Sequence, residues 1–189
     1  ERFEVPIGPA QITAMVIFVL IVLFEILFPF RKYLRRIRHY SKNVVFSLIN
    51  TIITGLSGAA MSLWVFLWIE ENQIGLLNLV ELPFWLSVLL ASLIFDCWLY
   101  WWHRINHVVP FFWRFHQVHH NDLEMDMSTA LRFHPGEILL SSIINVGIFA
   151  LFGITVELLV LYKLVFNFSV LFHHSNIAIP VQLDRLLRL

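Results

Sequence analysis

The sequence predicts an all-α fold, a polytopic bundle of membrane-spanning helices that forms a single domain. Hydrophobic residues make up 59% of the 189-residue chain and the mean hydropathy is +0.76, far above the values of a soluble domain. The apolar residues are grouped in blocks of about 20 or more, the length that a helix needs to cross a bilayer. Strands are not expected, because only helices and closed barrels satisfy the backbone inside a membrane.

Three apolar blocks are predicted to be spanning helices, at residues 10–30, 44–69 and 83–102. A fourth apolar stretch covers residues 138–172, which is too long for one helix, and Gly153 lies near its middle. We therefore expect two shorter helices there that meet in a hairpin. The first block is long enough to span and lacks a small-residue cleavage site, so it is not predicted to be a signal peptide.

The distribution of lysine and arginine predicts the topology. Residues 31–42 contain six of the 13 Lys and Arg residues, whereas residues 70–82 contain three glutamates and no base. Basic loops stay on the cytoplasmic side, so we place residues 31–42 on the cytoplasmic face of the membrane. That membrane is expected to be a bacterial inner membrane or the endoplasmic reticulum. The third span then returns the chain to that side. The net charge is zero, which gives no general attraction to nucleic acid.

Five histidines follow the third span within two short motifs, HRINH (residues 103–107) and HQVHH (residues 116–120). They are His103, His107, His116, His119 and His120. Spacings of three and four residues place each set on one helical face. Imidazole binds iron, zinc, copper and nickel, so the pattern predicts a metal site at the membrane edge. The competing interpretation is a solvated, aromatic-rich interfacial helix.

Asp96 lies inside the third span, two helical turns before His103. An acid within a membrane is costly and usually has a partner. Two interpretations stay open for it. In one, the carboxylate orients a ligand imidazole; in the other, it forms a helix-packing hydrogen bond to a neighbouring span.

The remaining histidines receive different predictions. His134 precedes a Pro-Gly-Glu sequence and is either an outer ligand or a cap of the next helix, and we favour a structural or supporting role. A hairpin would bring His173 and His174 back to the side of the two motifs, where one of them is expected to be a ligand. His39 lies among the bases of the first loop, and we expect it to be a solvated surface residue.

Several kinds of site are absent from the sequence. There is no HExxH metalloprotease motif, no phosphate-binding glycine loop and no Ser-His-Asp signature, and the single cysteine, Cys97, excludes a thiolate cluster. Many imidazoles with few carboxylates suit oxidative chemistry at iron, although zinc fits the same ligands. A zinc-binding or zinc-transport protein is the alternative, but transport sites lie near the bilayer midplane. A catalytically degenerate scaffold is the third hypothesis.

The two motifs resemble the HxxxH and HxxHH boxes of the membrane fatty acid hydroxylase and sterol desaturase superfamily. Residues 125–138 (MDMSTALRFHPGEI) and 172–177 (FHHSNI) resemble later segments of that family. The resemblance implies a non-haem di-iron oxygenase that hydroxylates or desaturates a C–H bond of a lipid, such as a sterol or a fatty acyl chain. It also implies dioxygen as the oxidant and a separate reductase or electron carrier as a partner.

Carried over by position, six residues resemble the metal ligands of the family: His103, His107, His116, His119, His120 and His174. His134 and His173 match less closely. The implied cofactor is two iron ions, for which zinc can substitute in a purified sample. The family's final HxxHH box has no counterpart in residues 178–189. We therefore expect the chain to be incomplete at its C-terminus, with further ligands beyond Leu189, and expect these 189 residues alone to be inactive.

Overall fold

The structure, a computed structural model, describes residues 7–33, 36–57 and 59–187. Within those ranges the fold is all-helical, as predicted, apart from one isolated bridge between Pro29 and Ile177. The helices, in chain order, are α1 (Ile7–Leu27), α2 (Arg36–Ser57), α3 (Ala59–Asn72), η1 (Leu76–Asn78), α4 (Phe84–Val108), α5 (Pro110–His120), η2 (Met127–Leu131), α6 (Pro135–Phe152), α7 (Val156–His174) and α8 (Val181–Leu187).

Three of the described helices, α4, α6 and α7, are long and apolar enough to cross a membrane. They identify the chain as an integral membrane protein. α4 begins one residue after the start of the third predicted span and continues past its end to Val108, so both histidines of the first motif belong to this helix. α6 and α7 are the two arms of the predicted hairpin.

The first two predicted spans differ from the helices observed. The block at residues 10–30 corresponds to α1, which runs from Ile7 to Leu27 and therefore begins and ends three residues earlier than predicted. The block at residues 44–69 is divided between α2 and α3, and residue 58 between them lies outside the described residues. α2 begins at Arg36, before the predicted span, so the basic residues that precede the span are helical from Arg36 onward. Neither α2 nor α3 is among the candidate spans found in the described part of the chain.

Two glycines allow the hairpin turn to pack against the η1 loop. Gly153 ends α6 in the left-handed conformation, with φ of 71°, and Gly75 precedes η1 with φ of 107°. A Cβ atom on Gly75 would lie 2.0 Å from the backbone nitrogen of Gly153, so no side chain fits between the two backbones. The Thr155 side chain then caps α7 by accepting a hydrogen bond from the Leu158 amide. This turn reverses the chain, and α7 then packs against α4 and α1.

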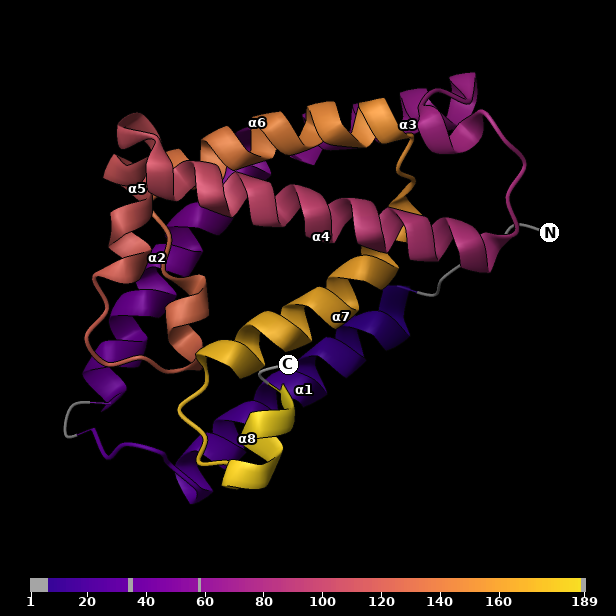
Figure 1. Cartoon of the computed structure of the whole chain (residues 1–189). Helices are drawn as coiled ribbons and strands as arrows, with labels where there is room; N and C mark the ends of the chain where they lie inside the picture. Colours follow the sequence, from indigo (N-terminus) through magenta and orange to yellow (C-terminus); the bar gives the residue numbers. More distant parts are fainter. Residues whose placement is uncertain (1–6, 34–35, 58, 188–189) are drawn as a thin grey trace.

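The apolar core lies between α3, α4, α6 and α7. Phe95 on α4 contacts Phe149 on α6 edge to face at 5.6 Å and stacks on Tyr162 of α7 at 4.6 Å between ring centroids. Such aromatic pairs each add about 0.5–1.5 kcal/mol beyond the burial of their area. From this core the three long helices run to one end of the molecule, at the left of Figure 1, where α5 lies across the end of α4.

Candidate metal centre

A bend between α4 and α5 brings the two histidine motifs together. Val109 is extended, and Pro110 occupies the first turn of α5, where its missing N–H group costs nothing. The Trp102 ring contacts Phe112 across the bend at 5.2 Å between centroids. The short helix α5 therefore folds back against the last turns of α4.

Four histidines from these helices form one group. They are His103 and His107 on α4 with His116 and His120 on α5, and their potential ligand atoms all lie within 4.8 Å of one another. The Nε2 atoms of His103 and His107 are 3.0 Å apart, and those of His116 and His120 are 3.1 Å apart. Two nitrogens that bind one ion at right angles, each about 2.1 Å from it, lie about 3.0 Å apart. The group could therefore hold a metal ion.

His119 and His174 form a second pair beside this group. Their Nε2 atoms are 3.2 Å apart, although the residues come from α5 and from the end of α7. Nδ1 of His174 donates to the Val170 carbonyl at 2.7 Å, and Nδ1 of His119 donates to the Arg132 carbonyl at 3.3 Å. With the proton on Nδ1, each ring presents the lone pair of Nε2 to the other. The hairpin thus returns His174 to the histidine motifs.

Glu137 was not predicted to take part in the site, yet it contacts the most deeply buried histidine of the four. Its Oε1 accepts a hydrogen bond of 2.8 Å from Nδ1 of His116, which leaves Nε2 of that ring free to bind a metal. The Glu137 side chain is 6% exposed, and its Oε2 has no hydrogen-bond partner in the described residues. Such an orphaned carboxylate oxygen is costly, and a cation held by the neighbouring imidazoles would offset its charge.

Two histidines of α5, His119 and His120, have environments that favour the neutral imidazole. Burial, together with the nearby His174 and His120 rings, lowers the pKa of His119 to about 4. Burial, then His116 and His107, also lowers the pKa of His120. Both rings are therefore neutral near pH 7, the form that coordinates metal ions.

Three other predicted site residues lie outside the four-histidine group. His134 caps α6, because its Nδ1 accepts a hydrogen bond of 2.9 Å from the Gly136 amide. His173 is exposed and lies beside Phe172. Asp96 accepts a hydrogen bond of 2.7 Å from the Tyr162 hydroxyl, which is the helix-packing contact of the two interpretations. Its predicted role in orienting a ligand has no contact to support it among the described residues.

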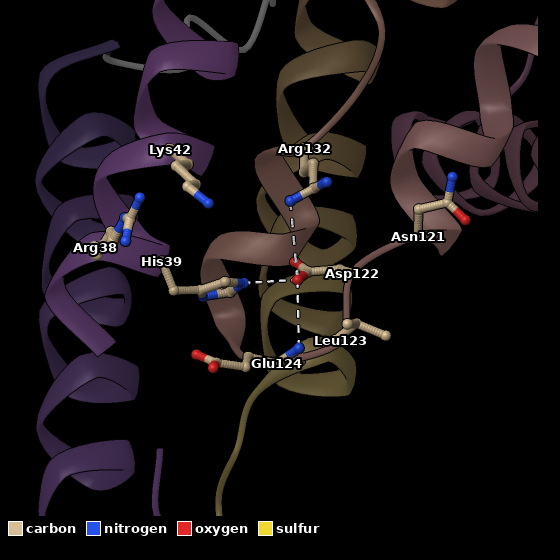
Figure 2. Close-up of a pocket in the computed structure, with 8 residues that line it drawn as sticks. All are labelled: Arg38, His39, Lys42, Asn121, Asp122, Leu123, Glu124 and Arg132. Carbon is tan, nitrogen blue, oxygen red and sulfur yellow. Dashed lines mark hydrogen bonds and ion pairs between the residues drawn. The ribbon is translucent and has the colours of Figure 1, made fainter. Parts of the chain in front are cut away.

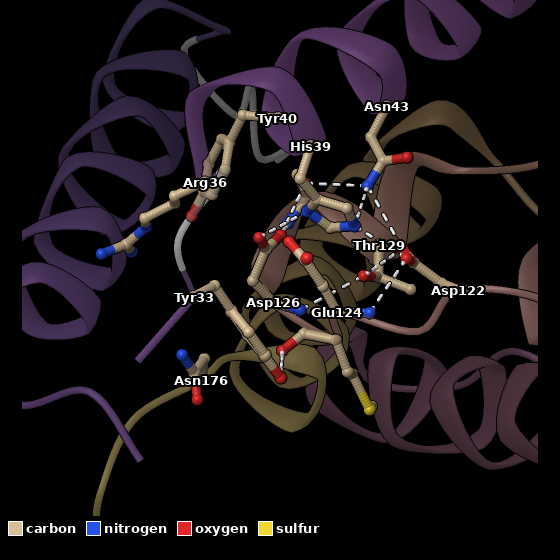
Figure 3. A network of polar contacts seen from close by, with 12 residues as sticks. Tyr33, Arg36, His39, Tyr40, Asn43, Asp122, Glu124, Asp126, Thr129 and Asn176 are labelled. Atoms are coloured by element: carbon tan, nitrogen blue, oxygen red, sulfur yellow. Dashed lines mark hydrogen bonds and ion pairs between the residues drawn. The ribbon is translucent and has the colours of Figure 1, made fainter. Parts of the chain in front are cut away.

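The prediction that His39 is a solvated surface residue is wrong. His39 is 9% exposed and lies between two carboxylates, with Nδ1 2.7 Å from Asp126 and Nε2 2.7 Å from Asp122 (Figure 3). Burial opposes protonation of His39, but the hydrogen bond to Asp122 and the charges of both carboxylates outweigh it and raise its pKa. His39 is buried because α2 packs on the segment after α5. This contact joins positions more than 80 residues apart, so the residues around His39 in the sequence do not indicate it.

Glu25 joins four segments behind the histidines. It is fully buried, forms an ion pair of 2.9 Å with Arg36, and accepts a hydrogen bond from Tyr40. Its Oε1 also accepts hydrogen bonds from the backbone amides of Met127, at 2.8 Å, and Asn176, at 2.6 Å. One carboxylate on α1 therefore fixes the start of η2 and the chain directly after His174. Glu25 lies within the apolar block at residues 10–30, and the sequence pattern around it does not indicate these partners.

Comparison with known proteins is consistent with this arrangement. A family model described as fatty acid hydroxylase matches residues 88–189, more than half of the chain. The chain is also 37% identical over 98 residues to a protein of Danio rerio named alkylglycerol monooxygenase, an alignment that covers 44% of this chain and 21% of that protein. The chain therefore matches about a fifth of the length of that relative. No solved structure matches the chain.

Proposed function

Because the chain belongs to the fatty acid hydroxylase family, we propose that it is the metal-binding part of a membrane lipid oxygenase. The observation that carries the proposal is the four-histidine group, whose ligand atoms lie within 4.8 Å of one another at the end of the apolar helices. The reaction is the hydroxylation of a lipid C–H bond. One atom of dioxygen enters the lipid and the other leaves as water, with two electrons and two protons consumed. Desaturation, which begins with the same hydrogen abstraction, is the alternative outcome.

The cofactor that fits these ligands best is iron. His103, His107, His116 and His120 would hold one ion, and His119 with His174 would contribute to a second, as in a di-iron site. Bound iron supplies the activation of dioxygen. Glu137 keeps the proton of His116 on Nδ1, and the Val170 and Arg132 carbonyls do the same for His174 and His119. These contacts orient the ligands before any metal arrives.

The lipid would reach the site between α4 and α7. A cavity of about 550 Å³ lies between these helices, lined mainly by apolar side chains of which Val88, Phe166 and Val170 are examples. Val170 is also the residue whose carbonyl holds His174, so the cavity ends beside the second histidine pair. An alkyl chain fits such a lining. Because the Danio rerio relative is named alkylglycerol monooxygenase, an alkylglycerol is the first substrate to test.

The proposed orientation places the histidines on the cytoplasmic face, where an electron-donor protein or reductase would supply electrons. The support is a contact between distant segments. Arg36 and His39, from the basic segment at residues 31–42, reach Glu25 and Asp126 beside the histidine end of the bundle. Basic loops stay in the cytoplasm, so the metal ligands would lie on that side.

The test is product formation by the full-length protein in lipid nanodiscs, supplied with iron, dioxygen, an electron donor and an alkylglycerol, a fatty acyl lipid or a sterol. Mass spectrometry should detect a product that carries one oxygen atom from ¹⁸O₂. The His116→Ala and His120→Ala variants should lose it, whereas Cys97→Ser, an exposed position outside the site, should retain it. Product formation by His116→Ala at the wild-type rate would contradict the proposal. Zinc binding without oxygen consumption would favour a zinc protein instead.

A further inference from the structure

We propose that a cleft between α2 and the segment after α5 binds the phosphate group of an anionic phospholipid. This basic cleft has a volume of about 410 Å³. Its lining residues are Arg38, His39, Lys42, Asn121, Asp122, Leu123, Glu124 and Arg132 (Figure 2). Binding at this cleft does not depend on the proposed oxygenase function.

Three cations from two separate elements face the cleft. Arg38 and Lys42 lie one helical turn apart on α2, and Arg132 follows η2 on the opposite wall. In Figure 2 the Arg132 guanidinium lies above Asp122 and the Lys42 amino group lies above His39. Clustered cations on two walls of one cleft are the arrangement that recognises a phosphate group.

The cationic groups at the rim are free to take an anion. Arg38 and Lys42 are exposed, and neither has an acidic side chain within ion-pair distance in the described part of the chain. The Asp122 carboxylate is already engaged, with Oδ1 2.7 Å from Nε2 of His39 and Oδ2 accepting a hydrogen bond of 2.7 Å from Thr129. Its distance to Arg132 is longer, at 3.9 Å, so that guanidinium is not saturated by the pair.

The second carboxylate of the lining does not oppose an anion at the rim. In Figure 2 the Glu124 carboxyl group lies below His39, on the far side from Lys42 and Arg132. One of its oxygens, Oε2, is buried. Glu124 is therefore separated from the cations at the rim, and Asp122 is the acidic side chain that lies near them.

Apolar side chains beside the cations favour a lipid over a soluble phosphate. Leu123 lines the cleft and is 92% exposed, and Ile37, next to Arg38, is 87% exposed. Exposed leucine and isoleucine beside lysine and arginine suit the boundary between headgroups and acyl chains. Basic pockets at the cytoplasmic ends of membrane helices bind anionic headgroups in this way.

Arg132 connects the cleft to the candidate metal centre. Its Nε donates to the Val118 carbonyl at 2.9 Å, and its own carbonyl accepts the hydrogen bond from His119 at 3.3 Å. A phosphate bound to Arg132 would therefore restrain the backbone that positions a proposed ligand. This consequence rests on the proposed function.

The binding test uses native mass spectrometry of the full-length protein in detergent, titrated with phosphatidylglycerol or phosphatidylcholine. Wild type should retain phosphatidylglycerol at about tenfold lower concentration than phosphatidylcholine. The Arg38→Gln/Lys42→Gln variant should bind both lipids equally. The matched control, Arg31→Gln/Lys32→Gln, removes two bases from the same segment but outside the cleft, and should keep the preference.

Three outcomes would overturn the proposal. Retention of the phosphatidylglycerol preference by Arg38→Gln/Lys42→Gln would exclude the cleft, and an equal loss in the control would assign the effect to diffuse charge. Displacement of phosphatidylglycerol by millimolar inorganic phosphate would assign the cleft to a soluble anion instead of a lipid. Lipid binding is measured without iron, so none of these results depends on whether the protein is an oxygenase.

Discussion

Oε1 of Glu137, in the first turn of α6, lies 2.8 Å from Nδ1 of His116 on α5. The carboxylate fixes the tautomer of the ring and directs its Nε2 toward the other three histidines. Partners of this kind typically change metal affinity by about 10–100-fold when they are removed. This contact connects α5, which carries His116, to α6, which carries Glu137.

The first prediction concerns this contact. Glu137→Ala should weaken iron or cobalt binding by about 10–100-fold, because His116 loses its fixed orientation. The metal affinity of Glu137→Gln should lie between those of wild type and Glu137→Ala, because the amide oxygen still accepts a hydrogen bond but carries no charge. Metal titration of the purified protein measures this, with Glu157→Gln in the first turn of α7 as the control. Unchanged affinity in Glu137→Ala would disprove the role.

The second prediction separates His134 from the metal ligands. His134→Ala removes the cap of α6 and should lower the free energy of unfolding by about 1 kcal/mol, because the Gly136 amide loses its acceptor. Metal content should not change. His134→Asn should restore most of the stability, since asparagine is a good cap. Loss of metal from a His134→Ala protein that remains folded would instead make His134 a ligand.

The cap and the histidine motifs could be predicted from the sequence because both depend on local spacing. Residues three and four apart on one helix are neighbours in any helical fold, so the pairs His103–His107 and His116–His120 needed no tertiary information. The hairpin was also predictable, from the length of the apolar stretch and from Gly153.

The contacts that support the site were not predictable, because they join segments distant in the sequence. Glu137 reaches His116 across 21 residues, and His39 reaches Asp122 across 83. Glu25 reaches Asn176 across 151 residues. Such pairs depend on how the helices pack against one another, and single-chain patterns carry no signal for this.

The third prediction tests Glu25. Arg36→Ala leaves the buried Glu25 carboxylate without its ion-pair partner and should destabilise the protein by about 3–5 kcal/mol. Glu25→Ala removes the acceptor of the Met127 and Asn176 amides, so hydrogen exchange at both should accelerate. Denaturation and exchange mass spectrometry measure these effects. Wild-type exchange at Met127 and Asn176 in a folded Glu25→Ala protein would show that Glu25 does not hold these segments.

The fourth prediction concerns pH. The two carboxylates beside His39 raise its folded pKa above the ordinary value of 6.5, against the effect of burial. The protonated ring therefore contributes its full stabilisation below about pH 6.5, and this is lost as the pH rises through the folded pKa. The Tm difference between wild type and His39→Gln should shrink between pH 6 and pH 9. A difference that is constant or grows over this range would contradict the assignment.

We propose that the four histidines of α4 and α5 hold one metal ion. The most direct test is the iron content of the full-length protein after anaerobic loading and removal of free metal. Four single variants, His103→Ala, His107→Ala, His116→Ala and His120→Ala, are compared with His134→Ala as the folded control. Each of the four should lose iron at a concentration where wild type and the control retain it. Wild-type iron content in any folded member of the four would contradict the claim.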